Sequence, residues 1–532
     1  MDKRTILAIA LSLAVIIIYQ LFFFKPPVKP PTPAPTKEVV KGKEEGPVIA
    51  KSLKEKMAVV PQMGEEKPVT VETPLYTAVF TTRGAGLTSF KLKKYKKTLD
   101  VHSEPVDLVS LKVGMKAPLG ISFTNSSFEL PDDIFFTAPQ ERIELKKGER
   151  EARLMFSSTL PGKLKLEKIY TFYPDRYAVD LEMKVANLSP APIEQVAVVN
   201  WYEYLDPKVE KDDYGHTGPV VFVKNEVERP EVKKITGDKL YGPGMTWGGF
   251  ESKYFLAAVI SPNPSLTSMY VEKKATGDEI TVRVKGEKVV IPPTQASSIS
   301  YRLYLGPKEY NLLKAEGVNL EDAIDFGSWL KWLAMPLLIT LNFFNQYINN
   351  YGISIILLTV LIKILFWPLG NKSYQSMKEM QKLQPKLLEL REKYKDDKQR
   401  LSQETMALYK AHKINPLGGC LPMIIQIPVF FGLYRALLYA IELRHAPFFG
   451  WIKDLSAKDP YYITPIIMGA TMFIQQKMTP TGGDPMQQKI MLWMPVVFTF
   501  LFLNFPSGLV IYWLFNNIIS IGQQIYINKR HG

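Results

Sequence analysis

Beyond about Trp329 the chain contains a series of long apolar runs, each of which must be buried in protein or in lipid. A helix needs about 20 apolar residues to cross a hydrocarbon core about 30 Å thick, so the shorter runs suit a thin or locally thinned bilayer. Together with an uncharged N-terminal run, they predict a polytopic α-helical membrane protein with six transmembrane helices. The predicted spans are 5–24, 353–369, 418–440, 461–476, 490–504 and 509–527.

The N-terminal run is either a signal anchor that stays in the membrane or a signal peptide that is removed. It is long for a signal peptide, and the residues around Lys25 make a poor cleavage site, which favours the anchor. Lys3 and Arg4 then hold residues 1–4 in the cytoplasm. Alternation of the spans places loops 371–417 and 478–489 and the tail 528–532 in the cytoplasm as well, and loop 441–460 outside.

The charge of the loops agrees with this orientation. Loop 371–417 carries 11 Lys and Arg residues against six Asp and Glu, as the positive-inside rule requires of a cytoplasmic segment. Both termini are therefore expected in the cytoplasm, with the large polar domain on the other side of the membrane.

The polar part of the chain predicts strands. A Pro-, Lys- and Glu-rich linker, 25–58, is followed by alternating segments such as 69–73 and 76–80. Residues 279–284 and 288–291 alternate on either side of Lys285-Gly-Glu, which predicts a hairpin with its turn at 285–287. The region 59–324 is therefore expected to form a large antiparallel β-sandwich domain outside the cytoplasm.

Two helical segments flank the second span. Region 325–349 has Trp and Leu residues at helical spacing and predicts an interfacial amphipathic helix, with a packed core helix as the alternative. Loop 371–417 predicts a helical hairpin whose first helix is kinked or begins late because of Pro385. The residues that mark this hairpin are Met377, Leu383 and Leu387 on its apolar stripe and Asp396 and Asp397 in its polar turn.

Lys363 is the candidate functional residue, because it lies near the middle of its span. A charge at that depth costs about 2.5–3.5 kcal/mol and needs water or a partner, unless its stem lets the ammonium reach the cytoplasmic side. Arg435 lies nearer the outer end of its span, where reaching water is easier. Polar residues within the spans, among them Thr359, Gln426 and Asn516, either bond neighbouring helices or line a wetted cavity around Lys363.

Several short motifs resemble those of YidC-type membrane protein insertases. They include Asn415-Pro-Leu-Gly-Gly-Cys-Leu-Pro422, Asp484-Pro-Met-Gln-Gln488 and Phe505-Pro-Ser-Gly508, and they follow one another through most of 352–524. The signal anchor, the β-domain and the interfacial helix resemble the bacterial form with a periplasmic domain. The resemblance implies a non-enzymatic insertase and chaperone that receives nascent hydrophobic segments in a positively charged hydrophilic groove and releases them laterally into the inner membrane.

The family resemblance also implies roles for particular residues. Lys363 falls where relatives usually carry arginine, so the charge is kept but the bidentate fork is not. Thr359 and Trp513 match substrate-facing positions of the groove, with Tyr512 beside the latter. The expected groove residues are Lys363, Thr359, Gln426, Tyr512, Trp513 and Asn516. The expected partners are nascent membrane proteins, the Sec translocon and membrane lipids, with the ribosome and the signal recognition particle receptor as further candidates.

Other functional classes fit the sequence less well. The net charge of +14 could indicate nucleic acid binding, but positive loops and anionic lipid explain it in a membrane protein, so no direct nucleic acid partner is expected. Neither a metal nor any other cofactor is expected, because Cys420 is the only cysteine and the five histidines are scattered. A secondary transporter or channel is the alternative, although the repeats typical of transporters are not evident. An intramembrane protease would need a nucleophile, but the sequence has no G-x-S-x-G motif, and Ser328 with Lys331, which has the spacing of a Ser–Lys dyad, lies on the expected interfacial helix.

Overall fold

The computed structural model describes residues 57–58 and 64–531, apart from 113, 131–133, 206–214, 236, 275–276, 278, 328, 396, 413–420 and 479–484. The expected span 5–24, most of the linker 25–58, Ser328 and Asp396 therefore lie outside the described residues. The chain divides into two compact units, one formed by Lys54–Tyr374 with Cys420–Gly532, the other by Met1–Leu53 with Gln375–Gly419.

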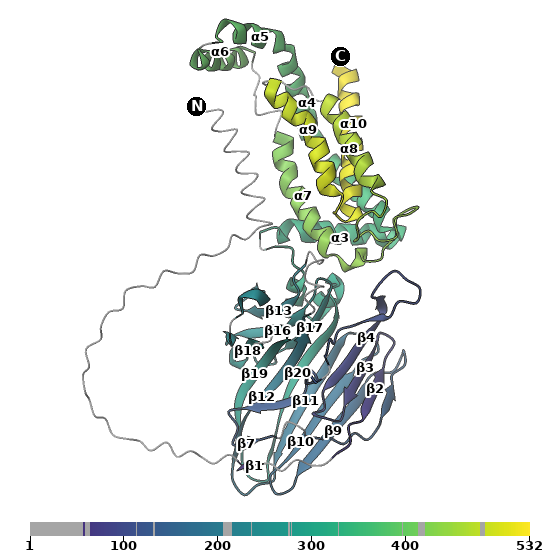
Figure 1. Cartoon of the computed structure of the whole chain (residues 1–532), viewed down its shortest axis with the longest axis vertical. Coiled ribbons are helices and arrows are strands. Elements are labelled where there is room, and N and C mark those ends of the chain that lie inside the picture. Colours follow the sequence, from purple (N-terminus) through teal and green to yellow (C-terminus); the bar gives the residue numbers. More distant parts are fainter. Residues whose placement is uncertain are drawn as a thin grey trace, which may run out of the picture. The chain divides into compact units, whose positions relative to one another are not determined.

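The first unit contains strands followed by helices (Figure 1). The strands are β1 (Met57–Ala58), β2 (Pro68–Glu72), β3 (Tyr76–Thr81), β4 (Leu87–Lys96), β5 (Pro105–Asp107), β6 (Ile121–Thr124), β7 (Phe128–Glu129), β8 (Arg142–Glu144), β9 (Ala152–Leu160), β10 (Leu164–Phe172), β11 (Ala178–Asn187), β12 (Ile193–Tyr204), β13 (Gly218–Val223), β14 (Glu226–Glu228), β15 (Lys239–Tyr241), β16 (Met245–Glu251), β17 (Phe255–Ile260), β18 (Ser268–Lys273), β19 (Glu279–Ile291) and β20 (Ala296–Pro307).

The helices occupy the C-terminal part of the chain. They are α2 (Tyr310–Ala315), α3 (Lys331–Ile348), α4 (Tyr351–Lys382), α5 (Gln384–Lys393), α6 (Lys398–Ala411), α7 (Leu421–Tyr439), α8 (Ile463–Met478), α9 (Pro485–Phe502) and α10 (Ser507–His531), with short 3₁₀ turns η2 (Val232–Lys234), η3 (Pro264–Leu266), η4 (Leu320–Ala323) and η5 (Ile441–Leu443).

Among the described residues, the β-domain has three large sheets and a two-stranded one, β1-β7. The largest has eight strands in the order β14-β13-β16-β17-β20-β11-β10-β9, and Figure 1 shows the middle strands of this sheet side by side. Two five-stranded sheets follow the orders β15-β18-β19-β12-β6 and β5-β4-β3-β2-β8. The pairing is mostly antiparallel, as predicted, but β1 with β7 and β2 with β8 are parallel.

Side-chain alternation along β10 shows how the sequence builds this core. Alternate residues from Leu164 to Phe172 are buried, as expected for a strand with one face on a core. Lys168 occupies one of these inward positions, and its ammonium donates to the backbone carbonyls of Ala85 and Leu119. Burial away from any counter-charge lowers the pKa of Lys168 to about 7. The lysine therefore ties two loops together from inside the core.

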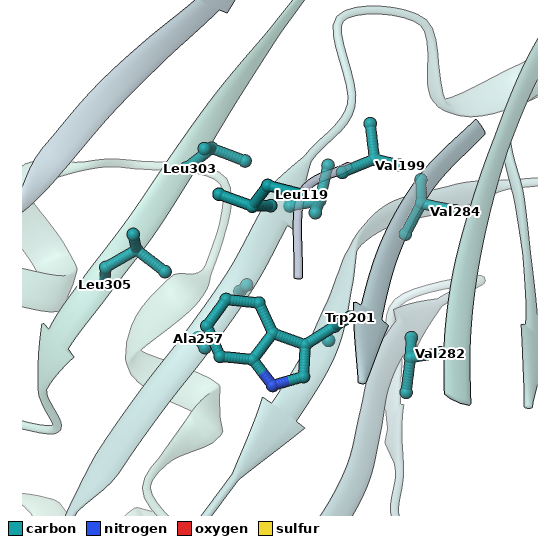
Figure 2. A pocket seen from close by; sticks show the side chains of 11 residues that line it. Leu119, Val199, Trp201, Ala257, Val282, Val284, Leu303 and Leu305 are labelled. Carbon is teal, nitrogen blue, oxygen red and sulfur yellow. The ribbon is translucent and has the colours of Figure 1, made fainter. Parts of the chain in front are cut away.

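A small cavity of about 10 Å³ lies between the eight-stranded sheet and the sheet that contains β12 and β19. Figure 2 shows that its walls are apolar, with Leu303 and Leu305 on one side, Val282 and Val284 on the other, and Trp201 between them. Such a space holds at most one water and offers it no polar partners. The cavity is a packing defect between the two sheets and has no room for a ligand.

The predicted hairpin at 285–287 is wrong. β19 runs without a turn from Glu279 to Ile291, and β12 pairs with it on both sides of these residues, with a register shift between Val196 and Val198. Gly286 is needed for close packing, because a Cβ atom there would lie 2.4 Å from Tyr301 Oη. The glycine that resembles a turn signal in the sequence is thus a contact point within a strand.

The helical part of the first unit consists of α2, α3, α4 as far as Tyr374, and α7 to α10. α8 packs against both α9 and α10, and α3 packs against α7. A Cβ atom on Gly469 of α8 would lie 1.9 Å from Thr499 Oγ1 of α9, so these two helices approach closely because residue 469 has no side chain. Among the described residues, α4 alone is long and apolar enough to span a membrane, and α9 has a shorter apolar stretch, Met491–Phe502.

α3 is amphipathic. Leu337, Leu338 and Leu341 are buried, whereas Trp332 and Tyr347 are at least 70% exposed. The sequence left open an interfacial amphipathic helix and a packed core helix. The structure has features of both, because one face of α3 packs on protein while the other exposes large aromatic side chains.

Within the second unit, the structure describes residues 375–412 apart from 396. Here α4 ends at Lys382 and α5 begins at Gln384, so Pro385 lies in the first turn of α5, where proline is tolerated. The expected first helix of the hairpin is therefore divided between the end of α4 and α5. Asp397 caps α6, since its side chain accepts a hydrogen bond from the Arg400 amide at 2.9 Å.

Candidate functional site

Lys363 lies on α4 and reaches toward α10. Its Nζ donates a 2.7 Å hydrogen bond to Ser520 Oγ, and Ser520 in turn donates to the carbonyl of Asn516, also on α10. The Tyr374 side chain lies within interaction range of Ser520 as well. No acidic side chain among the described residues forms an ion pair with Lys363, which is partly exposed. The ammonium therefore has a neutral partner and keeps its positive charge uncompensated.

Ser520 belongs to a polar stripe along α10, which we define as Asn516, Asn517, Ser520, Gln523 and Gln524. All five side chains are buried. Their spacing of three and four residues places them on one face of the helix, where neighbouring helices can meet them. Sequence analysis singled out Asn516 but missed Ser520, although helical spacing from Asn516 would have revealed it.

The polar stripe connects α10 to helices on two sides. Toward α4, Gln523 Nε2 donates to Asn371 Oδ1 at 3.0 Å, in addition to the Lys363–Ser520 bond. Toward α8, Asn517 Nδ2 donates to Thr471 Oγ1 at 3.3 Å and Gln524 Nε2 to the carbonyl of Met478 at 2.6 Å. The stripe thus holds α4, α10 and α8 together by hydrogen bonds.

Thr359 does not share the environment of Lys363. Its side chain is 1% exposed, and its hydroxyl donates to the carbonyl of Ile355 one turn earlier at 2.7 Å. Such a bond satisfies the hydroxyl within its own helix. Thr359 lies one turn from Lys363, as the sequence predicts, but it offers no open polar surface in this structure.

Tyr512 and Gln426 lie near one another across α10 and α7. The Tyr512 hydroxyl is buried and makes no hydrogen bond of normal geometry, although the Gln426 side chain lies within interaction range. A buried hydroxyl without a full hydrogen bond lowers the stability of the fold, and a polar group that entered here could satisfy it.

Trp513 lies in an aromatic cluster, which we define as Phe430 of α7, Phe498 and Phe502 of α9, and Trp513 itself. The ring of Trp513 is 4.7 Å from that of Phe430, 6.0 Å from that of Phe498 and 5.2 Å from that of Phe502. Its indole Nε1 is buried and has no hydrogen-bond partner. Trp513 therefore packs α10 against α7 and α9 and leaves one donor unused.

The other cation within an expected span, Arg435 of α7, has protein partners. Its Nη1 lies 3.3 Å from Asp325 Oδ2, and it also donates to the Tyr439 hydroxyl at 3.4 Å. Burial alone raises the pKa of Asp325, but the charges of Arg229 and Arg435 hold it below its usual range. Arg435 is thus a paired cation, whereas Lys363 is not.

The hairpin residues that mark the second unit lie on different elements. Met377 is on the end of α4, the buried Leu383 lies between α4 and α5, and Leu387 is on α5. Asp397 is the cap of α6 described above. In the described part of the chain, no group of three or more His, Cys, Asp and Glu side chains is arranged to hold a metal ion.

Comparison with known proteins covers the whole length of the chain. The family described as "60Kd inner membrane protein" matches residues 343–532, and the domain described as "YidC periplasmic domain" matches residues 68–340. A "Membrane protein insertase YidC" of Syntrophus aciditrophicus is 61% identical over 544 residues, which are 100% of both chains. A protein of the same description from Geobacter metallireducens is 44% identical over 99% of this chain and 98% of its own.

The similarity to solved structures is weak. A structure titled "Crystal structure of YidC from Thermotoga maritima" is 15% identical, covers 88% of this chain and 99% of its own, and gives a TM-score of 0.30, which is too low to bear on the fold. The sequence matches do not depend on it. They confirm the resemblance seen in the motifs: the chain belongs to the YidC family of inner-membrane protein insertases that carry a β-rich periplasmic domain.

Proposed function

We propose that this insertase receives nascent hydrophobic segments in a hydrophilic groove centred on Lys363 and releases them laterally into the membrane. The observation that carries the proposal is the Lys363 ammonium, bonded to the neutral Ser520 hydroxyl and without an acidic partner among the described residues. A positive centre of this kind attracts acidic flanks of a substrate, and a wet path spares its polar groups the cost of crossing dry hydrocarbon.

Release requires one side of the helix bundle to open more easily than the other. The polar stripe bonds α10 to α4 and α8, whereas Trp513 meets α7 and α9 through the aromatic cluster. Aromatic contacts are replaceable by the apolar side chains of a substrate, but buried hydrogen bonds are not. The apolar segment therefore leaves along α7 and α9, and the polar frame stays closed.

The proposed topology has six spans, 5–24 and the five that correspond to α4, α7, α8, α9 and α10. Both termini lie in the cytoplasm and the β-domain in the periplasm, in agreement with the charge of loop 371–417. α3 lies at the periplasmic surface of the inner membrane, where its exposed Trp332 and Tyr347 meet lipid headgroups.

The hairpin formed by the end of α4, α5 and α6 is the proposed first contact for substrates on the cytoplasmic side. Nascent membrane proteins are the clients, and the Sec translocon is the proposed partner for those that need it. The ribosome and the signal recognition particle receptor would deliver clients to the hairpin. Its exposed Leu388 and Met406 support a role in contacting hydrophobic segments.

Reconstitution tests this function directly. Purified protein in lipid vesicles should insert a short single-span client in a protease-protected orientation, and vesicles without the protein should insert much less. A transporter or channel would instead show asymmetric uptake of small solutes and no gain in client insertion, and that result would refute the proposal.

A further inference from the structure

The outer end of α7 is held by polar contacts with three separate parts of the chain. Arg435 pairs with Asp325 before α3. Glu442, in η5, accepts a hydrogen bond from Asn342 of α3 at 3.2 Å. Arg444 donates to the carbonyl of Lys96, at the end of β4, at 2.6 Å.

The Asp325 carboxylate is itself part of a buried set of charges. Arg229 Nη2 donates to the carbonyl of Ala323 at 2.8 Å, two residues before Asp325, and its Nε lies 2.7 Å from Glu251 Oε1. The second oxygen of the fully buried Glu251 accepts from Lys308 Nζ at 3.1 Å. The segment that presents Asp325 to α7 is therefore anchored in the β-domain by charged hydrogen bonds.

Deeper along its length, α7 is held differently. Besides its packing on α3, it makes ring contacts there, with Phe430 against Trp513 and Tyr434 against Phe505. Ring contacts of this kind tolerate sliding and rotation more readily than an ion pair does, because they are weak and less directional. The ion pair is consequently a more directional constraint on the position of α7 than these ring contacts are.

We infer that the Asp325–Arg435 ion pair is a positioning device, which holds α7 in place against α3 while its inner part moves aside for a substrate. The consequence for insertion rests on the proposed function, but the positioning itself does not. Removal of Asp325 leaves the partly buried Arg435 without its ion-pair partner, and removal of Arg435 leaves Asp325 beside the charges of Arg229 and Lys308 alone; breaking such a pair costs more than breaking an exposed one. Arg435 acts through the position of α7 and is not expected to touch the substrate.

Distances between spin labels on three helices test this inference in the full-length protein reconstituted in lipid, with Cys420→Ser as the background. Ile427 on α7, Ile518 on α10 and Ile467 on α8 are exposed and suited to labelling. Arg435→Gln should broaden and shift the 427–518 distance distribution and leave the 467–518 distribution unchanged. Asp325→Asn should reproduce this effect.

Conservative and reciprocal changes complete the test. Arg435→Lys should keep the 427–518 distribution narrow, and the double exchange Asp325→Arg with Arg435→Asp should narrow it again relative to either single change. An unchanged 427–518 distribution in Arg435→Gln and Asp325→Asn would overturn the inference. Equal broadening of both distributions would also overturn it, since that result means general loosening of the bundle.

The insertion assay separates this inference from the proposed function. Client insertion should fall several-fold in Arg435→Gln and recover in Arg435→Lys. Altered distances with normal insertion would contradict the role in insertion and leave the proposed function intact. Absence of insertion by the unaltered protein would refute the proposed function, and the distance measurements would still decide whether the ion pair positions α7.

Discussion

Replacement of Lys363 should change which clients the protein inserts. Its Nζ gives one hydrogen bond to Ser520, so the ammonium keeps two further N–H groups for water or substrate. A client carboxylate held one water away, about 5 Å from Nζ, gains about 3 kcal/mol at an effective dielectric of ~20. Such a gain corresponds to roughly a hundredfold preference for an acidic over a neutral translocated flank.

Two versions of one single-span client, with acidic and neutral flanks, measure this preference as a ratio of insertion rates in lipid vesicles. The ratio should fall toward one in Lys363→Met and invert in Lys363→Glu, because charge reversal changes the sign of the interaction. Lys363→Arg should keep the ratio. Ser520→Ala is the matched control, since it removes the hydrogen-bond acceptor and leaves the charge in place.

The ratio does not depend on how much protein reaches the membrane, because both clients meet the same vesicles. Equal ratios in the unaltered protein, Lys363→Met and Lys363→Glu would refute the reasoning. The positive centre would then have no electrostatic role in client choice.

Three further predictions concern stability and whether insertion requires the β-domain. Burial raises the pKa of Glu203 from 4.5 to about 8, so its contribution to stability is complete below pH 4.5 and is lost as the pH rises through 8. Over this pH range the free energy of unfolding should fall by about 5 kcal/mol in the unaltered protein. Glu203→Gln should remove most of this pH dependence, which thermal melts at several pH values would measure. Gly469→Leu should lower the melting temperature and Gly469→Ala less, because the added side chain meets Thr499; equal melting of both would contradict close packing of α8 on α9. Deletion of 59–322, with Asp325 and α3 retained, should still support client insertion, at a reduced level because the anchor of Asp325 in the β-domain is lost, and complete loss at normal membrane levels would refute that separation.

Local patterns in the sequence predicted some of the strands and most of the helices. Alternation predicted strands such as β3, and helical spacing predicted α3 and the helices of loop 371–417. These patterns succeed because each depends only on near neighbours and on which face is buried. The prediction of a hairpin at 285–287 failed for the same reason, because Gly286 resembles a turn residue locally while its actual constraint is the close approach of the Tyr301 hydroxyl.

The candidate site could be predicted only in part. Lys363 was evident from its depth in an apolar run, and Asn516 from its place in another. Their connection was not evident, since Ser520 lies 157 residues from Lys363 in the chain. Thr359 matched a groove position by resemblance, yet its hydroxyl is bonded to its own helix.

The sequence by itself determined that this chain has a series of apolar runs, a polar domain rich in strands, and a lysine in the middle of one run with no acidic residue in any run to neutralise it. Only the tertiary structure decided the partners: Ser520 for Lys363, and Asp325 for Arg435 across 110 residues. The physical reason is that hydrophobic patterning reports the environment of a segment, whereas an ion pair or hydrogen bond depends on which distant segments the packed helices bring within about 3 Å of each other.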